Sequence, residues 1–260
     1  MNLCIDIGNT TTKLGIFQND ELIVKISFTT DIDKTSDELF LIIRNQVFAH
    51  DIDMSKIDVI IFGSVVPRIN FAFKEALKKL CPEAKFISVG PGIKTGLCMK
   101  IDNPNEVGSD LIADLVGTKE KYGYPSLIID LGTATKILLI DKNGVFTSCV
   151  IMPGINISAS ILSNKAALLP EVSLESPKPL LDCKNTAQAM NSGILFGHLE
   201  MIKGMVKRYE NELGYNCHKI LTGGASKYIA QFLSSYTYEK ELSLVGLNYL
   251  AKRNEGLYEK

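Results

Sequence analysis

Apolar runs separated by short polar turns recur along the chain, and the first two runs predict a β-hairpin. Residues 3–5 are apolar and lead into Asp6, and residues 14–17 form the second run after Gly8, a group of threonines and Lys13. This order is typical of a strand, a tight turn and a second strand. The sequence therefore predicts a hairpin with a carboxylate at the end of its first strand and a glycine at its bend.

The rest of the chain alternates between the hydrophobic periods of strands and helices. Alternating or continuous apolar residues predict strands at 21–29, 57–66, 85–89, 145–152 and the start of 219–226. Apolar residues at helical spacing, with capping residues, predict helices at 35–49, 69–80, 109–117, 155–168, 186–210 and 241–252. A further helix is expected after the Gly-Gly pair of 219–226. This succession predicts the α/β class, with mixed sheets flanked by helices.

The hairpin has a second copy in the middle of the chain, where residues 127–140 read LIIDLGTATKILLI. Its turn repeats the first at a constant offset, with Asp130, Gly132 and Thr133 placed as Asp6, Gly8 and Asn9 are. Matching carboxylates, glycines and apolar flanks indicate a duplicated domain. We expect one domain over 1–118 and a second over 119–260, with the two turns facing each other and clamping a nucleotide.

The residues of the first turn suit phosphate groups. Backbone N–H groups and a lysine can face phosphate oxygens, while a carboxylate holds a metal ion. We therefore expect residues 6–13 to bind a triphosphate, with Asp6 also holding the metal ion: Asp6, Ile7, Gly8, Asn9, Thr10, Thr11, Thr12 and Lys13. Gly223 and Gly224 leave room for a base or a sugar against the backbone. The alternative is an ordinary hairpin with a polar turn.

Asp110 is the second carboxylate that is a candidate for a functional role. It follows the turn at Asn103-Pro104 and the pair Gly108-Ser109, in the first turn of a predicted helix. A carboxylate at that place often only compensates the helix dipole. Asp114, one turn further along, is equally compatible with a surface charge.

Composition excludes several classes of protein. The chain has 260 residues, 46% of them hydrophobic, and a net charge of −1, so we expect neither a nucleic acid nor a membrane surface as partner. Its six cysteines form no C-x-x-C pair and its three histidines no metal-ligand spacing, which favours free thiols in a reducing compartment. The N-terminus lacks the features of a signal peptide, and no apolar run spans a bilayer. A soluble, cytoplasmic protein is expected.

The ordered motifs resemble the type III pantothenate kinase family, within the superfamily of acetate and sugar kinases, heat-shock chaperones and actin. The resemblance runs along most of the chain. Its motifs are DIGNTTTK at 6–13, GSVVP at 63–67, GPGIKTGL at 90–97, DNPNEVGSD at 102–110, DLGTAT at 130–135, MPGI at 152–155, AALLP at 166–170, NTAQAMNSGILFG at 185–197 and TGGAS at 222–226. It implies two ribonuclease-H-like domains, a homodimer, and transfer of the ATP γ-phosphate to the hydroxyl of pantothenate, the first step toward coenzyme A.

The resemblance also implies roles for individual residues. Asp110 would be the general base, and Asp130 would bind a monovalent cation, K⁺ or NH₄⁺. Thr133 would contact ATP. The acceptor pantothenate would lie against Gly108, Ser109, Asp110 and Leu111, with Thr186 contributing.

The sequence departs from the family pattern at several positions. Leu111 stands where an arginine is usual, Ile101 where a tyrosine is frequent, and Lys136 and Leu138 where threonine and aspartate are usual. Ser148 and Cys149 replace glycines. Two alternatives therefore stand beside a pantothenate kinase: a kinase of the same fold with another small hydroxyl acceptor, and a nucleotide-binding, non-catalytic paralogue with a regulatory role.

Overall fold

The computed structural model describes residues 1–256, which form two compact units. The first unit comprises Met1–Leu97, Asp102–Lys121 and the described residues from Leu242 on, and the second comprises Cys98–Ile101 and Tyr122–Glu241. The change at Lys121 lies close to the predicted boundary after residue 118. The last helix, which the predicted range 119–260 gave to the second domain, groups with the first unit because it packs on that unit's sheet. Residues 257–260 of that range lie outside the described residues.

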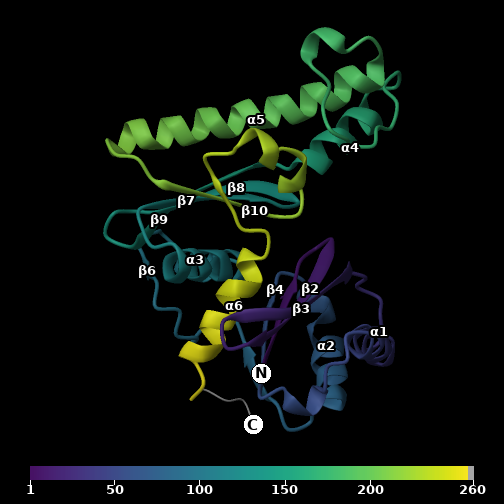
Figure 1. Ribbon diagram of the computed structural model, residues 1–260, viewed down its shortest axis with the longest axis vertical. Helices are drawn as coiled ribbons and strands as arrows, with labels where there is room; N and C mark the ends of the chain where they lie inside the picture. Colours follow the sequence, from purple (N-terminus) through teal and green to yellow (C-terminus); the bar gives the residue numbers. More distant parts are fainter. Residues whose placement is uncertain (257–260) are drawn as a thin grey trace. The chain divides into compact units, whose positions relative to one another are not determined.

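The first unit is built on a five-stranded sheet in the order β3-β2-β1-β4-β5 (Figure 1). Its strands are β1 (Asn2–Ile7), β2 (Thr11–Gln18), β3 (Glu21–Thr29), β4 (Val59–Ser64) and β5 (Lys85–Ser88). The first three strands are antiparallel neighbours, and β1, β4 and β5 run parallel. The predicted hairpin and the mixed sheet are both confirmed.

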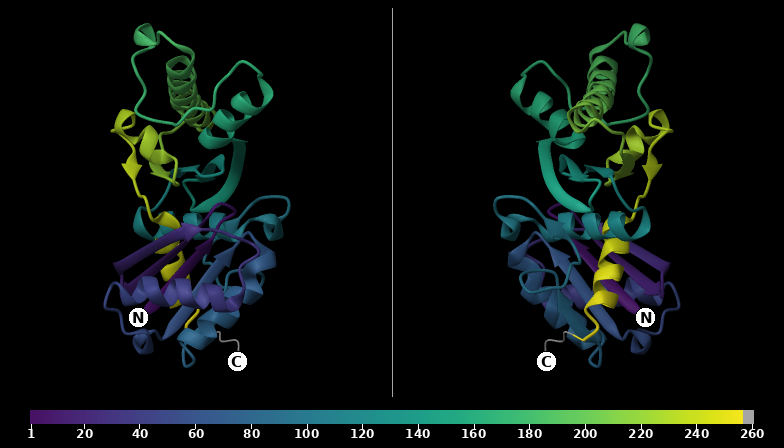
Figure 2. Two further views of the ribbon diagram at one scale, coloured as in Figure 1. Left: turned by 90° about the vertical axis from the view of Figure 1, so that its right-hand side faces the viewer. Right: turned by 90° about the vertical axis from the view of Figure 1, so that its left-hand side faces the viewer.

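Strand alternation gives this sheet two different faces. Leu3, Ile5 and Ile7 of β1 belong to the hydrophobic core formed with α1 (Ser36–Phe48) and α2 (Pro67–Leu80). Because successive side chains of a strand point to opposite faces, Cys4 and Asp6 lie on the other side. That face carries α3 (Ser109–Lys121) and α6 (Leu242–Arg253), and Figure 2 shows α6, in yellow, running across the purple strands.

The two helices α3 and α6 cross at close range through glycines. A Cβ atom added to Gly246 of α6 would lie 1.8 Å from the carbonyl oxygen of Ala113 in α3. One added to Gly117 of α3 would lie 2.9 Å from the carbonyl oxygen of Leu242. Only residues without a side chain allow this approach, so the two glycines fix how α6 lies against α3.

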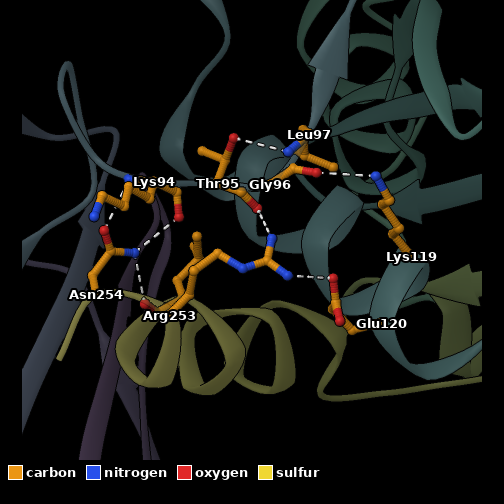
Figure 3. Close-up of polar contacts among 9 residues, drawn as sticks. Lys94, Thr95, Gly96, Leu97, Lys119, Glu120, Arg253 and Asn254 are labelled. Carbon is orange, nitrogen blue, oxygen red and sulfur yellow. Dashed lines mark hydrogen bonds and ion pairs between the residues drawn. The ribbon is translucent and has the colours of Figure 1, made fainter.

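The end of α6 is tied to the loop over residues 94–97, part of the GPGIKTGL motif (Figure 3). The Arg253 guanidinium donates to the carbonyl of Thr95 and forms an ion pair with Glu120 at 2.7 Å. The side chain of Asn254 accepts from the backbone N–H of Lys94 and donates to its carbonyl. These bonds hold the loop against α6 and α3 within the first unit.

The second unit repeats the topology of the first. Its sheet has the order β11-β10-β7-β8-β9-β6, with β7 (Ser126–Leu131), β8 (Ala134–Ile140), β9 (Val145–Pro153), β10 (His218–Thr222), β11 (Thr237–Tyr238) and β6 (Cys98–Met99). Again three antiparallel strands are followed by two parallel ones, so β7 corresponds to β1 and β10 to β4. The shared strand order confirms the duplication that the two hairpins predicted.

Two helices cover one face of the second sheet. Leu127, Ile129 and Leu131 of β7 pack in a core with α4 (Ile155–Lys165) and α5 (Thr186–Leu213). Within the described chain, a Cβ added to Gly193, Gly197 or Gly204 of α5 would meet no atom within 4 Å, so no other helix of the chain approaches α5 there.

The structure differs from the sequence expectations in short elements. The helix expected after the Gly-Gly pair is replaced by two short 3₁₀ turns, Ser226–Tyr228 and Ala230–Phe232. The strands β6 and β11 were not predicted, because two residues are too few to show a period.

Among the described helices, none combines the length and apolar character that crossing a membrane requires.

Candidate active site

Asp6 lies at the end of β1, on the face covered by α6. Its Oδ2 accepts a hydrogen bond from the hydroxyl of Ser243, in the first turn of α6, at 2.7 Å. The Lys13 Nζ lies 4.0 Å from the same oxygen, and the Asp6 side chain keeps 14% of its surface exposed. Lys13 faces Asp6 because the two residues are register partners in the antiparallel pair β1–β2. The arrangement supplies a carboxylate and a cation at one point of the hairpin.

The tip of this hairpin is polar and open to solvent. Asn9, Thr10 and Thr11 are exposed, while the Gly8 N–H donates to the Thr11 carbonyl and closes the turn. The side chain of Thr12 is not exposed at the tip, as a ligand-binding role for it would require. It is fully buried, and its hydroxyl is hydrogen-bonded to that of Thr30 at 2.8 Å. Thr12 therefore offers only its backbone to a ligand at the tip.

Ile7 and Cys4 of β1 are core residues. Ile7 is fully buried, so it too offers only its backbone to a nucleotide. Burial raises the pKa of the Cys4 thiol well above its usual value. A thiol with a raised pKa is poorly nucleophilic at neutral pH, which leaves Cys4 a packing role beside Asp6.

The helix that carries Asp110 lies next to Asp6. Gly63 of β4 is the register partner of Asp6, and a Cβ added to Gly63 would lie 3.2 Å from the Cβ and the Oγ of Ser109. Ser109 is the first residue of α3 and Asp110 the second. The missing side chain at Gly63 thus lets the start of α3 sit on the sheet, which puts Asp110 on the same face as Asp6.

Gly108 and Ser109 shape the start of α3. The Oδ1 of Asp110 lies close to Gly108, because a Cβ atom added to Gly108 would be only 2.5 Å from this oxygen. The Ser109 hydroxyl is buried and has no hydrogen-bond partner among the described residues. A buried hydroxyl without a partner is unfavourable, and this oxygen packs against Gly63 of β4.

Two neighbours of Asp110 differ in environment. Leu111 is half-buried, whereas Asp114 is only 4% exposed, which overturns its interpretation as a surface charge. Arg68, which directly follows the GSVVP motif, forms a surface ion pair with Asp33 at 2.9 Å.

In the second unit, Asp130 ends β7 in the same way that Asp6 ends β1. Its carboxylate is 2.8 Å from the Nζ of Lys136, its register partner on β8. A Cβ added to Gly223, at the end of β10, would lie 2.5 Å from the Asp130 Oδ1, and Gly223 has φ +88°. The Gly-Gly turn therefore touches the Asp-x-Gly turn, as the two predicted nucleotide motifs of this unit require.

The other predicted residues of the second unit are spread around these turns. Thr133 is exposed at the hairpin tip, and Gly224 is exposed beside Gly223. A Cβ at Gly154 would lie 2.1 Å from the Thr133 carbonyl oxygen, so the MPGI segment supports this tip closely. Thr186 is the exposed first residue of α5, after the cap Asn185.

A cavity of about 470 Å³ opens elsewhere in the second unit. It is lined by α4 residues such as Asn156 and Ser160, together with Glu171 and Tyr228, and includes none of the predicted site residues. Among residues 1–256, no three or more His, Cys, Asp or Glu side chains gather in a way that could hold a metal ion.

Known proteins similar to this chain identify its family. The family model described as type III pantothenate kinase matches residues 2–208. A protein named type III pantothenate kinase from Halalkalibacterium halodurans is 37% identical over 255 residues, which cover 98% of this chain and 100% of that protein. The chain belongs to the type III pantothenate kinase family. The resemblance found in the sequence motifs is thereby confirmed.

Solved structures extend the fold comparison beyond this kinase family. A putative Baf family transcriptional activator from Campylobacter jejuni superposes with a TM-score of 0.60 at 21% identity, covering 98% of this chain and 100% of that one. A putative 2-dehydro-3-deoxygalactonokinase from Sinorhizobium meliloti gives 0.56 at 16% identity, covering 100% and 99%. At these identities the likeness shows the fold alone, a mixed α/β fold with two sheets flanked by helices.

Sequence reasoning missed two site residues of this pantothenate kinase family member. Ser243 gave no signal, because its contact with Asp6 joins opposite ends of the chain. Lys136 was noted only as a departure from the family pattern, although its place across the hairpin from Asp130 follows from strand register.

Proposed function

We propose that this protein phosphorylates pantothenate with ATP, giving 4′-phosphopantothenate in the first step of coenzyme A biosynthesis. Family membership supports the reaction, and one structural observation supports the catalytic arrangement. That observation is the shared face of the first sheet, where Asp6 ends β1 and Asp110 begins α3 beside Gly63, the register partner of Asp6. A phosphate-binding turn and a candidate base are then neighbours in one unit.

The hairpin residues are assigned to the nucleotide. The backbone of residues 8–12 and the Lys13 ammonium bind phosphate oxygens, and Gly223 and Gly224 accept the base or the sugar. Asp6 fits a role toward Mg²⁺, because it presents a partly exposed carboxylate beside a lysine that neutralises phosphate charge. Bound Mg²⁺ would withdraw charge from the transferring phosphoryl group.

Asp110 is assigned the role of general base. A carboxylate next to the acceptor hydroxyl removes its proton as the bond to phosphorus forms, and phosphoryl transfer asks for little else than alignment and charge neutralisation. Gly108, Ser109 and Leu111 are assigned to the acceptor together with Asp110. The family resemblance also assigns Thr186 to acceptor binding.

The decisive experiment is a phosphorylation assay with purified protein. Radiolabelled ATP and Mg²⁺ are combined with pantothenate, and in parallel with other hydroxy acids and with sugars. We expect pantothenate to have the highest kcat/KM. Turnover of another acceptor alone would identify a kinase of different specificity, and ATP binding without any transfer would identify a non-catalytic protein.

We also propose a homodimer in the cytoplasm. Large apolar side chains are exposed on the second unit, where contact with a second copy would remove them from water: Ile151, Ile161, Leu168, Leu180 and Leu181. All six cysteines are free, which fits a reducing compartment. Light scattering on the purified protein gives the oligomeric state, and Leu168→Asp with Leu181→Asp should shift it to monomer.

A further inference from the structure

The ion pair between Asp130 and Lys136 is largely shielded from water. The Lys136 Nζ lies 2.8 Å from the Asp130 Oδ2, and the two side chains keep 14% and 12% of their surfaces exposed. A carboxylate in such a place needs a positive partner, since an unpaired buried charge is strongly unfavourable. In this chain the partner is a covalently attached ammonium group.

The hairpin geometry delivers that ammonium group. Asp130 and Lys136 are directly opposite each other on β7 and β8, so their side chains share one face of the sheet. The other face takes Ile129 and Ile137 into the hydrophobic core. The alternation of side chains along β8 that buries Ile137 in the core therefore also places Lys136 on the same face of the sheet as Asp130.

The same carboxylate contacts the proposed nucleotide turn. A Cβ atom added to Gly223 would lie 2.5 Å from the Oδ1 of Asp130, so this oxygen is close to the Gly-Gly turn. The other carboxylate oxygen of Asp130, Oδ2, pairs with Lys136. Lys136 therefore fixes the carboxylate against Gly223. Its effect on a nucleotide at Gly223 and Gly224 is transmitted through Asp130, which makes Lys136 a positioning residue.

A dissociable monovalent cation does not fit beside this pair. The resemblance to the family implies K⁺ or NH₄⁺ at Asp130, and such an ion would neutralise a carboxylate that is costly to bury unpaired. The structure supplies the neutralising charge from Lys136. A second cation at the same carboxylate would be repelled by the ammonium at short range and low dielectric.

We propose that the Lys136 ammonium takes the place of a dissociable monovalent cation at Asp130, so that nucleotide binding and turnover need no added K⁺ or NH₄⁺. The proposal about turnover rests on the proposed kinase function, whereas the proposal about nucleotide binding does not. Its test therefore uses MgATP affinity and melting temperature beside the rate.

The first measurement uses the unaltered protein. MgATP affinity by calorimetry, and the rate of pantothenate phosphorylation, are measured at constant ionic strength in KCl, NH₄Cl, NaCl and tetramethylammonium chloride. We expect the four salts to agree within about threefold. A stronger gain in K⁺ or NH₄⁺ in either quantity overturns the proposal.

The second measurement removes the ammonium. Lys136→Ala deletes the charge and leaves space at Asp130, so MgATP affinity should fall by about tenfold or more in tetramethylammonium chloride and recover in K⁺ or NH₄⁺. The melting temperature should recover in the same salts. Lys136→Met deletes the charge but refills the space, and should not recover. Equal loss of affinity by Lys136→Ala in every salt overturns the proposal, because a merely structural lysine would give that pattern.

Two further variants complete the test. Lys136→Arg keeps the positive charge and should show no response to K⁺, so a K⁺-dependent Lys136→Arg protein would contradict the proposal even if Lys136→Ala does not fold. Lys203→Ala removes an exposed lysine of α5 that pairs with Glu200, and serves as the matched control without cation response. If no acceptor is phosphorylated but MgATP binds equally in all four salts, the kinase assignment fails and the role of Lys136 stands.

Discussion

The hydroxyl of Ser243 donates a 2.7 Å hydrogen bond to the carboxylate of Asp6, across a sequence separation of 237 residues. Ser243 is 6% exposed, so the bond is largely shielded from water. The C-terminal helix thereby completes the environment of the first hairpin. The N-terminal motif, to which we assign nucleotide binding, therefore does not include every group around Asp6.

Ser243→Ala should weaken ATP use selectively. Loss of a hydrogen bond to a charged group costs about 1.5–3 kcal/mol, or roughly tenfold or more in affinity. We expect the KM for ATP to rise by about that factor while the KM for pantothenate stays nearly constant. Steady-state kinetics with each substrate varied in turn measures this. Ser234→Ala, at an exposed turn position of the second unit, is the control and should change neither constant.

Asp110→Asn tests the general base. The substitution keeps the size of the side chain and removes its ability to accept a proton, so the rate of phosphoryl transfer should fall by about 10²–10⁴-fold. Asp110 is half-buried at a helix start, and we expect the melting temperature to change little. Turnover close to that of the unaltered protein would remove Asp110 from the mechanism.

Much of the fold followed from local pattern. Leu3, Ile5 and Ile7 alternate with polar or small neighbours, and Thr35 with Glu38 forms the capping box that starts α1. Such signals need only neighbouring residues, which is why the hairpins, the long helices and the duplication were predicted. The motif order also led to the correct family.

The features that the sequence did not predict depend on contacts between residues that are far apart along the chain. The packing of α6 on the first unit depends on Gly246 facing Ala113, and no periodicity in residues 241–252 reveals its partner. The buried hydroxyl of Thr12 is paired with the hydroxyl of Thr30, the residue after the end of β3. The ammonium at Asp130 depends on strand register, which a single sequence fixes only after the hairpin turn is known.

The crossing of α3 and α6 gives a stability prediction. In Gly246→Ala the new methyl group would overlap the Ala113 carbonyl oxygen, 1.8 Å from the added Cβ, and the helices must separate. Overpacking of this kind costs about 1–3 kcal/mol or more, and we expect the melting temperature to fall by roughly 5–10 °C. Thermal unfolding followed by circular dichroism measures it.

Gly204→Ala is the matched control for the helix crossing. Gly204 lies in the interior of α5, and an added Cβ would meet no described atom within 4 Å. Alanine is favoured over glycine inside a helix by about 1 kcal/mol, so this variant should melt slightly higher than the unaltered protein. Equal losses in the two variants would contradict the close crossing of α3 and α6.

Leu111 is the departure from the family pattern with the clearest consequence for the acceptor. It follows Asp110 directly and is half-buried, whereas Ile112 and Leu115 of the same helix are buried in the unit. An arginine there would hold an anionic acceptor through charge-assisted hydrogen bonds that leucine cannot make. The Arg68 side chain, a candidate substitute, is engaged with Asp33 at the surface.

Leu111→Arg should therefore improve the use of pantothenate. A new hydrogen bond to a carboxylate contributes about 1.5–3 kcal/mol, which corresponds to roughly a tenfold to hundredfold lower KM for pantothenate. The KM for ATP should stay nearly constant, because the hairpin residues are untouched. Leu111→Lys, with one charge but no planar pair of donors, should give a smaller gain. If the leucine instead serves packing, Leu111→Arg would lower the melting temperature and leave pantothenate kinetics no better, and paired kinetic and thermal measurements on the two variants separate these outcomes.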